Sequence, residues 1–523
     1  MSTQLNMADG IRQFARAYPT QEAAVDGERR LTFGAIDERS NRLASGLLAR
    51  GHRPGEPVAV LSGNRIEYLE IATALAKAGL PMVSLNAKST AADNAYIVGH
   101  SGARALILDN ALSDSASDVI DDVGIALSMD GGAAEGYEQF LAASVARDPE
   151  TRVPEDGIFA IAYTSGTTGV PKGVQLTHRG RVLTAYGAAL KYGLGPSRST
   201  MAVAPLYHGA GFSFGYIGPQ LGGKVTILRS WDPEEFLRLL SESRTNSVFL
   251  VPTHAQQVRR FTDEPMRDYD LSALETLYFN AAALPVELKE WVHRAFPGVD
   301  IHELYGSTEC SIVTDLRPED SLRKAGTVGH PWFMNEVRLL DDDGQDVPPG
   351  TPGELFARSP MLMAGYLHDA AATREATTAD GYVTVGDVAV QDEDGYVSIV
   401  DRKKDMVVSG GVNIYPREIE EMVVRHRDID EVAVVGLPDD TYGERVAAFV
   451  VSAPGREVDV EALGEFAREG LARYKAPREW HVVDALPRNA SGKIVKQQLR
   501  DMHVAGELSG APMKRSAGGD SDG

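Results

Sequence analysis

The chain has 523 residues and a mass of 56.3 kDa, more than one ordinary hydrophobic core organises, so we expect at least two domains. Its 43% hydrophobic and 24% charged residues are typical of a soluble globular enzyme. The formal net charge of −22 excludes a general nucleic-acid-binding protein, which would need a basic surface to contact phosphates. No apolar run approaches the ~18 residues of a membrane span, and residues 1–11 lack the basic and apolar regions of a secretory signal. We therefore expect a cytoplasmic protein.

Helical and strand-like segments alternate along residues 1–150. The apolar pattern predicts helices over 37–48 and 68–78 and strands over 58–61, 82–85 and 105–108. The same rhythm resumes after a polar stretch, and further strands are predicted over 159–163, 225–228, 248–251 and 276–279. This alternation predicts layered, mostly parallel sheets with helices on both faces.

Turn dipeptides become frequent between residues 331 and 400, where apolar and polar residues alternate. This pattern predicts a smaller, more antiparallel β-subdomain. The turns are Asp343-Gly344, Pro349-Gly350, Asp380-Gly381 and Asp394-Gly395.

A separate α+β module is predicted after residue 405. Its helices are expected over 416–426 and 460–469, and its strands over 432–435 and 447–451. The predicted fold class is therefore α/β, with a large N-terminal domain over 1–401, a small α+β C-terminal domain over 405–505 and a disordered tail over 506–523.

The single cysteine, Cys310, excludes an internal disulfide and a cysteine-based zinc site. A lone cysteine can be a nucleophile, but a reactive thiolate needs a basic neighbour, and a small buried side chain is the commoner case. We therefore assign no nucleophilic role to Cys310.

The strongest local motif is Tyr163-Thr-Ser-Gly-Thr-Thr-Gly-Val-Pro-Lys-Gly-Val174, directly after a predicted strand. Its glycines allow a tight turn that presents backbone N–H groups, and its hydroxyls and lysine suit a polyphosphate. A flexible surface loop is the alternative, which six successive hydroxyl or glycine residues after a buried strand disfavour. The motif is not a Walker A sequence, because its lysine is not followed by Ser or Thr. The residues expected at the phosphates are Thr164, Ser165, Gly166, Thr167, Thr168, Gly169 and Lys172.

Four further segments follow in a fixed order: Tyr305-Gly-Ser-Thr-Glu309, Val385-Gly-Asp387, Asp401-Arg-Lys-Lys-Asp405 with Ser409-Gly-Gly-Val-Asn413, and Pro487-Arg-Asn-Ala-Ser-Gly-Lys493. Together with the glycine-rich motif they resemble the ANL superfamily of adenylate-forming enzymes, in particular its branch of AMP-forming acyl-CoA synthetases and 4-coumarate-CoA ligase-like enzymes. The resemblance covers about residues 10–505. It implies a mobile C-terminal domain and a hinge over 402–404, with Lys404 as the hinge residue.

The resemblance places Tyr305 beside the adenine, Thr308 at the α-phosphate and Glu309 at a magnesium ion. Carboxylate and hydroxyl oxygens are the hard ligands that Mg²⁺ takes beside phosphate oxygens. Outside the motif, Glu309 would be read as an ordinary solvated glutamate. Asp387 and Arg402 would bind the ribose hydroxyls, although this chain has Val where the family has Thr two residues before the aspartate, and Asp387 could also be a turn residue.

Lys493 matches the family lysine that spans the substrate carboxylate and the α-phosphate during adenylation. A cation is needed there because the reaction brings two anions together; the alternative is a surface lysine in a polar turn. Gly410 and Gly411 resemble the border of the pantetheine tunnel, where only bare backbone allows a close approach. Tyr442 and Tyr474 are candidates to stack on the adenine of coenzyme A.

The acyl pocket is expected around two further segments, Pro205-Leu-Tyr-His-Gly209 and Asn280-Ala-Ala-Ala283. His208 resembles the aromatic gate between the ATP site and the acyl tunnel, but a structural histidine fits equally well. Asn280-Ala-Ala-Ala283 resembles the adenine-binding loop, with Ala282 and Ala283 at the adenine; Asn280 either reads a polar substituent or bonds to nearby backbone. The pocket residues are Tyr207, His208, Phe212, Asn280, Gly306, Cys310 and Val313. None is an arginine or lysine, which disfavours a dicarboxylic acid.

The resemblance implies ATP-dependent activation of a carboxylic acid through an acyl-adenylate, with release of pyrophosphate, followed by acyl transfer to coenzyme A. The implied cofactors are ATP, Mg²⁺ and coenzyme A as cosubstrate. An amine or a carrier-protein thiol is an alternative acceptor, and an oxidative luciferase-like activity has no positive sign in the sequence. The identity of the acid and the oligomeric state are left open.

Overall fold

The computed structural model describes residues 4–132, 134–164, 171–488, 494–506 and 511–512. Contacts divide the chain into two compact units. The large unit contains Met1–Arg338, Phe356–Val385 and Asp392–Ser398, and the small unit contains Leu339–Leu355, Gly386–Gln391 and Ile399–Gly523. The hinge at 402–404 stays a prediction.

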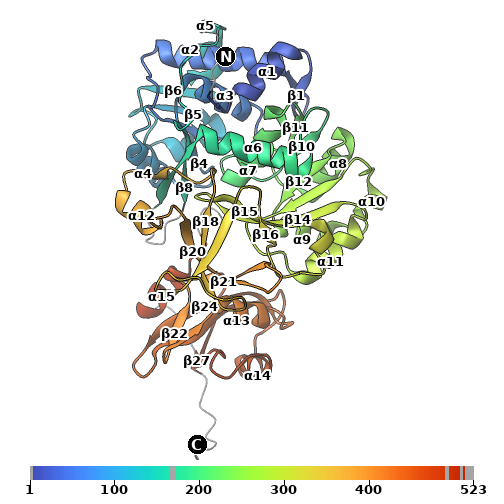
Figure 1. The fold of residues 1–523 in the computed structure, drawn as a ribbon, viewed down its shortest axis with the longest axis vertical. Coiled ribbons are helices and arrows are strands. Elements are labelled where there is room, and N and C mark those ends of the chain that lie inside the picture. The colour runs from blue at the N-terminus through green and yellow to red at the C-terminus, as the bar shows by residue number, and fades with distance from the viewer. Residues whose placement is uncertain (1–3, 133, 165–170, 489–493, 507–510, 513–523) are drawn as a thin grey trace, which may run out of the picture. The chain divides into compact units, whose positions relative to one another are not determined.

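An eight-stranded sheet in the large unit has the order β19-β9-β8-β4-β3-β5-β6-β7. Figure 1 labels four of its strands, β4, β5, β6 and β8. It is parallel from β8 to β7, and β9 runs antiparallel to β8 and β19. Its strands are β3 (Val58–Leu61), β4 (Met82–Leu85), β5 (Ala105–Asp109), β6 (Ile125–Met129), β7 (Glu135–Gly136), β8 (Ile158–Thr164), β9 (Lys172–Thr177) and β19 (Gly365–Tyr366). The neighbouring helices in sequence are α2 (Phe33–Ala49), α3 (Glu67–Ala78), α4 (Ala91–Ser101), η1 (Asn110–Ala116) and α5 (Tyr137–Ala143).

A nine-stranded sheet in the same unit has the order β16-β15-β14-β13-β12-β10-β11-β1-β2. The strands from β14 to β1 are parallel. The strands are β1 (Glu22–Asp26), β2 (Arg29–Thr32), β10 (Ser199–Ala202), β11 (Lys224–Ile227), β12 (Ser247–Leu250), β13 (Thr276–Phe279), β14 (Asp300–Ser307), β15 (Ser311–Leu316) and β16 (His330–Pro331). Its helices are α1 (Asp9–Ala17), α6 (His178–Tyr192), α7 (Gly209–Gln220), α8 (Pro233–Ser243), α9 (Pro252–Phe261), α10 (Pro265–Asp268) and α11 (Val286–Ala295), followed by η2 (Pro318–Asp320).

Both faces of the nine-stranded sheet are buried, because alternate residues of one strand enter different cores. In β13, Leu277 and Phe279 pack with side chains of α8, α9 and α11, whereas Tyr278 packs with side chains of α6 and α7. The predicted layered, mostly parallel α/β architecture is confirmed. Strands 58–61, 82–85 and 276–279 have the predicted bounds.

Two helix boundaries differ from the predictions by more than one residue. Helix α2 begins four residues early, at Phe33, because the Thr32 side chain caps it by accepting a hydrogen bond from Ala35 N. Helix α13 (Pro416–Val423) ends three residues before the predicted 426, and His426 N instead donates to Val423 O in a tighter turn.

A four-stranded sheet has the order β17-β18-β20-β21. Its strands are β17 (Glu336–Leu340), β18 (Gly353–Arg358), β20 (Val383–Gln391) and β21 (Val397–Arg402), with α12 (Ala370–Glu375) between the second and third. All four predicted turn glycines have positive φ, from 74° at Gly344 to 86° at Gly381 and Gly395. The turns are confirmed.

The small unit holds a six-stranded sheet in which β24 pairs with β25 and the remaining order is β23-β22-β25-β26-β27. Its strands are β22 (Val407–Ser409), β23 (Val412–Ile414), β24 (Ile429–Asp439), β25 (Gly443–Ser452), β26 (Glu479–Val482) and β27 (Ala511–Pro512), and its helices are α13, α14 (Val460–Gly470) and α15 (Lys496–Val504). Val434 faces the core shared with α13 and α14, and Val435 faces the core shared with α15. Of the tail predicted to be disordered, the structure describes residue 506 and β27, which pairs with β26.

Within the described ranges, no helix has the length and apolar content needed to cross a bilayer.

His178, the first residue of α6, makes the stability of the large unit depend on pH. Its side chain is 1% exposed, its Nδ1 accepts a hydrogen bond from Met7 N at 3.2 Å, and burial together with the charge of Arg12 lowers its pKa to about 4. The unfolded chain binds the proton below its ordinary pKa of about 6.5. The stabilisation is therefore complete above that pH and is lost as the pH falls toward 4, to a total of about 3 kcal/mol.

We predict that His178→Asn, whose Oδ1 can still accept from Met7 N, reduces the pH dependence of urea unfolding of the large unit between pH 6.5 and 4. An unchanged pH dependence would show that His178 titrates normally in the folded protein.

Candidate active site

The carboxyl ends of four adjacent parallel strands form one edge of the nine-stranded sheet, in the order β14-β13-β12-β10. The predicted gate residues 207–208 follow β10, the predicted adenine loop 280–283 follows β13, and residues 305–309 close β14 and the turn after it. Ligands of open α/β sheets bind outside the carboxyl ends of the strands. The topology therefore brings three predicted site segments to one edge.

Glu309 lies in the turn between β14 and β15 and connects this edge to the glycine-rich motif. Its Oε1 accepts a hydrogen bond of 3.1 Å from the Tyr366 hydroxyl, and Lys172 Nζ lies 5.0 Å from the centre of the Tyr366 ring. Lys172 begins β9 opposite Thr164, the last residue of β8. Residues 165–169, the remainder of the predicted phosphate contacts, lie outside the described residues.

The carboxylate of Glu309 is suited to a metal ion. Its side chain is buried, and no lysine or arginine forms an ion pair with it within the described part of the chain. A buried carboxylate is costly without a compensating partner, and a hard cation such as Mg²⁺ supplies one. Burial and the neighbouring Glu309 carboxylate both raise the pKa of Tyr366, so its hydroxyl keeps the proton that it donates. The chemistry of this carboxylate therefore fits the predicted magnesium ligand.

Backbone packing fixes the turn that carries Glu309. Met363 N donates to Glu309 O at 2.7 Å, and Cys310 N donates to Ser307 Oγ at 3.0 Å. A Cβ at Gly306 would lie 2.0 Å from Ser311 O, so only glycine fits at this position. The Glu309 backbone is thus held from both sides of the turn.

Cys310 is a buried filler, as predicted. Its side chain is 3% exposed, and its thiol contacts Val383 O at an Sγ–O distance of 3.7 Å. Val313 is buried to the same degree. The side chains of Cys310 and Val313 are therefore too buried to line an open acyl pocket in this conformation.

Aromatic rings follow β10 at the predicted acyl pocket. The rings of Tyr207 and His208 lie 4.7 Å apart, and His208 is the residue immediately before α7. Phe212, one turn into α7, stacks on Tyr216 with 5.0 Å between the two ring centres. The gating role of His208 stays a prediction.

The loop after β13 is shaped by its own backbone. Asn280 Oδ1 accepts a hydrogen bond of 2.5 Å from Ala281 N, and Ala281 has a positive φ of 73°. Of the two predicted roles for Asn280, the structure favours the local backbone bond. Ala282 and Ala283 are exposed. Tyr305 and Thr308, also predicted to bind the nucleotide, are half-buried at the neighbouring β14 end.

The two predicted ribose ligands meet in the small unit. Arg402 Nε donates to Asp387 Oδ1 at 3.1 Å, joining β21 to β20. Lys403 pairs with Asp342 and Glu354 at 2.8 and 3.0 Å. Burial lowers the pKa of Lys404, the predicted hinge residue.

Gly410 and Gly411 form the two-residue turn of the β22–β23 hairpin, with φ of 59° and 79°. Positive φ at both positions is the reason that such hairpins favour glycine. The sequence-based prediction gives only one reason for these glycines, the close approach of a ligand. Gly410 N donates to Tyr442 O at 2.8 Å, and the Arg478 guanidinium lies 4.3 Å from the centre of the Tyr442 ring.

Two predicted residues are not joined to these groups by the described contacts. Tyr474 is 49% exposed, and its neighbour Lys475 pairs with Glu418. Lys493 lies outside the described residues.

Sequence reasoning missed Tyr366. The residue reaches Glu309 because β19 pairs with β9, so that Tyr366 lies opposite Val174. This pairing joins segments far apart in the chain, and no local motif around Tyr366 indicates it.

Comparisons with known proteins agree on one family. Residues 11–367 match the family described as AMP-binding enzyme, and residues 418–493 match the AMP-binding enzyme C-terminal domain. A feruloyl-CoA synthase from Amycolatopsis sp is 35% identical over 489 residues, which cover 93% of this chain and 96% of that protein.

Solved structures give the same result. The o-succinylbenzoate CoA synthetase from Bacillus subtilis, in complex with its acyl-adenylate intermediate, has a TM-score of 0.86 and 27% identity and covers 96% of this chain and 99% of its own. An amide bond synthetase from Marinactinospora thermotolerans has a TM-score of 0.84 and 27% identity, with coverage of 95% and 99%.

We predict that Tyr366→Phe, which removes only the hydroxyl that donates to Glu309, lowers kcat/KM for Mg·ATP in acid-dependent pyrophosphate release by roughly 10-fold. The matched control is Tyr382→Phe, whose hydroxyl donates to Glu336 at 2.8 Å. Equal kinetics in both variants would mean that the Tyr366 hydroxyl does not support a ligand at Glu309.

Proposed function

We propose that this chain, which belongs to the AMP-binding enzyme family, joins a carboxylic acid to the thiol of coenzyme A through an acyl-adenylate. The observation that carries the proposal is the contact of Glu309, Tyr366 and Lys172 between a strand edge and the glycine-rich motif. A carboxylate oxygen of the acid attacks the α-phosphorus of ATP, and pyrophosphate leaves. The sulfur of coenzyme A then attacks the carbonyl carbon, and AMP leaves.

The residues divide this chemistry between them. Lys172 and the hydroxyls of the glycine-rich motif bind the phosphates, and Glu309 holds a magnesium ion that, when bound, neutralises phosphate oxygens. Asp387 and Arg402 orient the ribose. Lys493 offsets the repulsion between the acid and the α-phosphate, to which a unit charge ~4 Å away contributes about 4 kcal/mol at an effective dielectric constant near 20.

We place aromatic acids first among the substrates. The name of one relative, feruloyl-CoA synthase, refers to an aromatic acid with a single carboxyl group, which agrees with a predicted pocket that lacks arginine and lysine. The half-buried Tyr207 and His208 rings beyond β10 offer surfaces on which an aromatic ring can pack.

An amine acceptor is the second candidate, because the similar amide bond synthetase shares the fold over 95% of this chain. Coenzyme A is favoured by the grouping of the Gly410–Gly411 turn with Tyr442 and Arg478 in the small unit. This group offers bare backbone, an aromatic face and a cation, which suit a pantetheine arm, an adenine and a phosphate respectively.

We predict that Lys493→Ala lowers acyl-AMP formation by ~10²-fold or more, because it removes a charge that acts where two anions meet. Conversion of a supplied acyl-adenylate to the thioester should continue at the wild-type rate. Single-turnover assays of each half-reaction measure both effects. The control is Lys496→Ala, which removes a cation three residues further along the chain. Equal loss of both half-reactions in the Lys493 variant would contradict this division of labour.

We predict that Gly411→Asn spares acyl-AMP formation and slows thioester formation by about 10-fold or more, because its side chain enters the path of the thiol. Asparagine tolerates positive φ, and no heavy atom of the described residues lies within 4 Å of a Cβ built at Gly411, so the turn itself is kept. Gly455→Asn is the matched control in the same unit, with φ of 73° and the same free space. If the two variants transfer the acyl group equally well, the thiol does not pass Gly411.

A further inference from the structure

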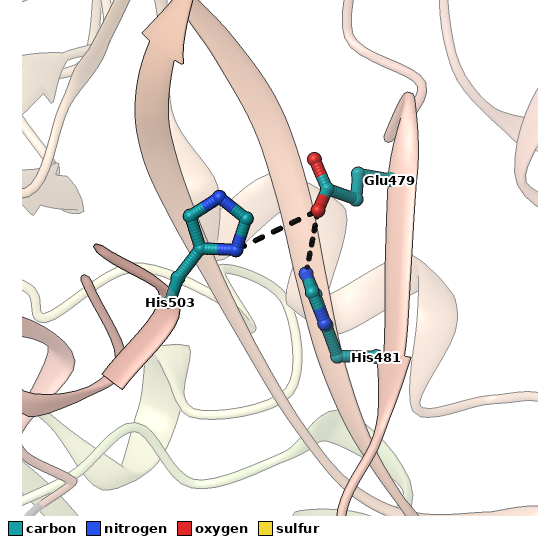
Figure 2. A group of neighbouring side chains, drawn as sticks. All are labelled: Glu479, His481 and His503. Carbon is teal, nitrogen blue, oxygen red and sulfur yellow. Dashed lines mark ion pairs between the residues drawn. The ribbon is translucent and has the colours of Figure 1, made fainter. Parts of the chain in front are cut away.

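Two histidines and a glutamate converge in the small unit, and none of them belongs to the sites described above. Glu479 and His481 lie two residues apart on β26, so their side chains leave the same face of the strand. His503 reaches them from the last turn of α15 (Figure 2). Figure 2 shows all three side chains pointing toward one another.

The distances in this triad, Glu479, His481 and His503, are close to those of a metal site. His481 Nε2 lies 2.9 Å and His503 Nδ1 lies 3.6 Å from Glu479 Oε1, and one ligand atom from each residue falls within 4.8 Å of the other two. Ligands around a tetrahedral zinc ion lie roughly 3.3 Å from one another, given bonds of about 2.0–2.2 Å. Two of the three separations are close to this value, and all three lie within 4.8 Å.

Three of the four histidine ring nitrogens form no hydrogen bond within the described part of the chain. His481 is 1% exposed, yet neither of its ring nitrogens forms a hydrogen bond within the described part of the chain. Its Nε2 is near Glu479 Oε1, but the geometry is not that of a hydrogen bond. His503 Nδ1 is likewise buried without a hydrogen bond among the described residues. Buried polar atoms without partners are rare in folded proteins, and an ion is one explanation for them.

Arg445 is the charged group that opposes a cation here. Its guanidinium donates to Glu479 Oε2 at 2.8 Å, and its NH2 group lies 3.4 Å from His503 Nε2. The first contact uses the carboxylate oxygen that faces away from the histidines, so Oε1 stays available to a metal. The second contact is long for a hydrogen bond, and it involves Nε2, so His503 Nδ1 stays available to a metal.

We propose that Glu479, His481 and His503 bind a zinc ion that ties α15 to β26. Two imidazoles and one carboxylate are a recurring protein ligand set for zinc, with water in the fourth position. Imidazole nitrogens select zinc over Mg²⁺, which prefers oxygen ligands, so the magnesium used with ATP does not compete. Helix α15 begins three residues after Lys493, and the ion therefore anchors the element that directly follows the predicted catalytic lysine.

The test uses the full chain without a histidine tag, freed of metal by a chelator and dialysed. Zinc chloride is titrated calorimetrically in excess Mg²⁺, and bound zinc is counted by mass spectrometry of the metal. We expect one zinc ion per chain, and slower hydrogen exchange in α15 and β26 when zinc is present. His503→Gln, which leaves the Arg445–Glu479 pair in place, should weaken zinc binding by roughly 100-fold or more, beyond what loss of an outer-sphere partner costs.

A second variant and a control separate coordination from folding. His481→Phe keeps a ring that can stack on Phe449, as His481 does at 4.4 Å, but offers no nitrogen. His426→Gln changes a histidine of the same unit that lies near Asp428 and outside the triad. Loss of zinc from the two triad variants alone, with circular dichroism equal to that of the metal-free wild type, supports the site. Absence of stoichiometric zinc in the wild type, or zinc binding that survives both triad variants, would overturn it.

Discussion

Adenylation of an acid brings a carboxylate against a triphosphate, so two anions must meet in a protein that itself carries a formal net charge of −22. At ~4 Å and an effective dielectric constant near 20, two like unit charges repel by about 4 kcal/mol. Only cations and N–H donors placed locally can offset this repulsion. The loops at the ends of parallel strands can carry such groups. The buried Glu309 accepts a hydrogen bond from Tyr366, whose ring lies next to Lys172, and the burial of this carboxylate favours a bound metal ion.

Much of the fold could be predicted because its sheets are buried on both faces. Short apolar runs such as 58–61 and 276–279 are unambiguous when helices cover both sides of a strand, and both were located to the residue. Helix ends were harder. The start of α2 depends on one hydroxyl, that of Thr32, and the end of α13 on how the last turn tightens, and neither alters the apolar pattern.

The site could be predicted where a motif is contiguous and could not where it depends on tertiary pairing. Glu309 and the Asp387–Arg402 pair are part of local patterns, whereas Tyr366 joins the site only through the pairing of β19 with β9. The sequence predicted that Gly410 and Gly411 border a ligand, but it did not show that a hairpin turn requires glycine at the same two positions. The cysteine count excluded one class of zinc site and said nothing of ligands contributed by a strand and a separate helix.

The most direct measurement is ATP-dependent pyrophosphate release across a panel of aromatic, cyclic and aliphatic acids, with and without coenzyme A, with mass spectrometry of the products. We expect an aromatic acid to give acyl-AMP in the absence of coenzyme A, and acyl-CoA with AMP in its presence. If acyl-AMP accumulates and coenzyme A changes nothing, the acceptor is an amine or a carrier protein. If no acid supports pyrophosphate release, adenylation itself is contradicted.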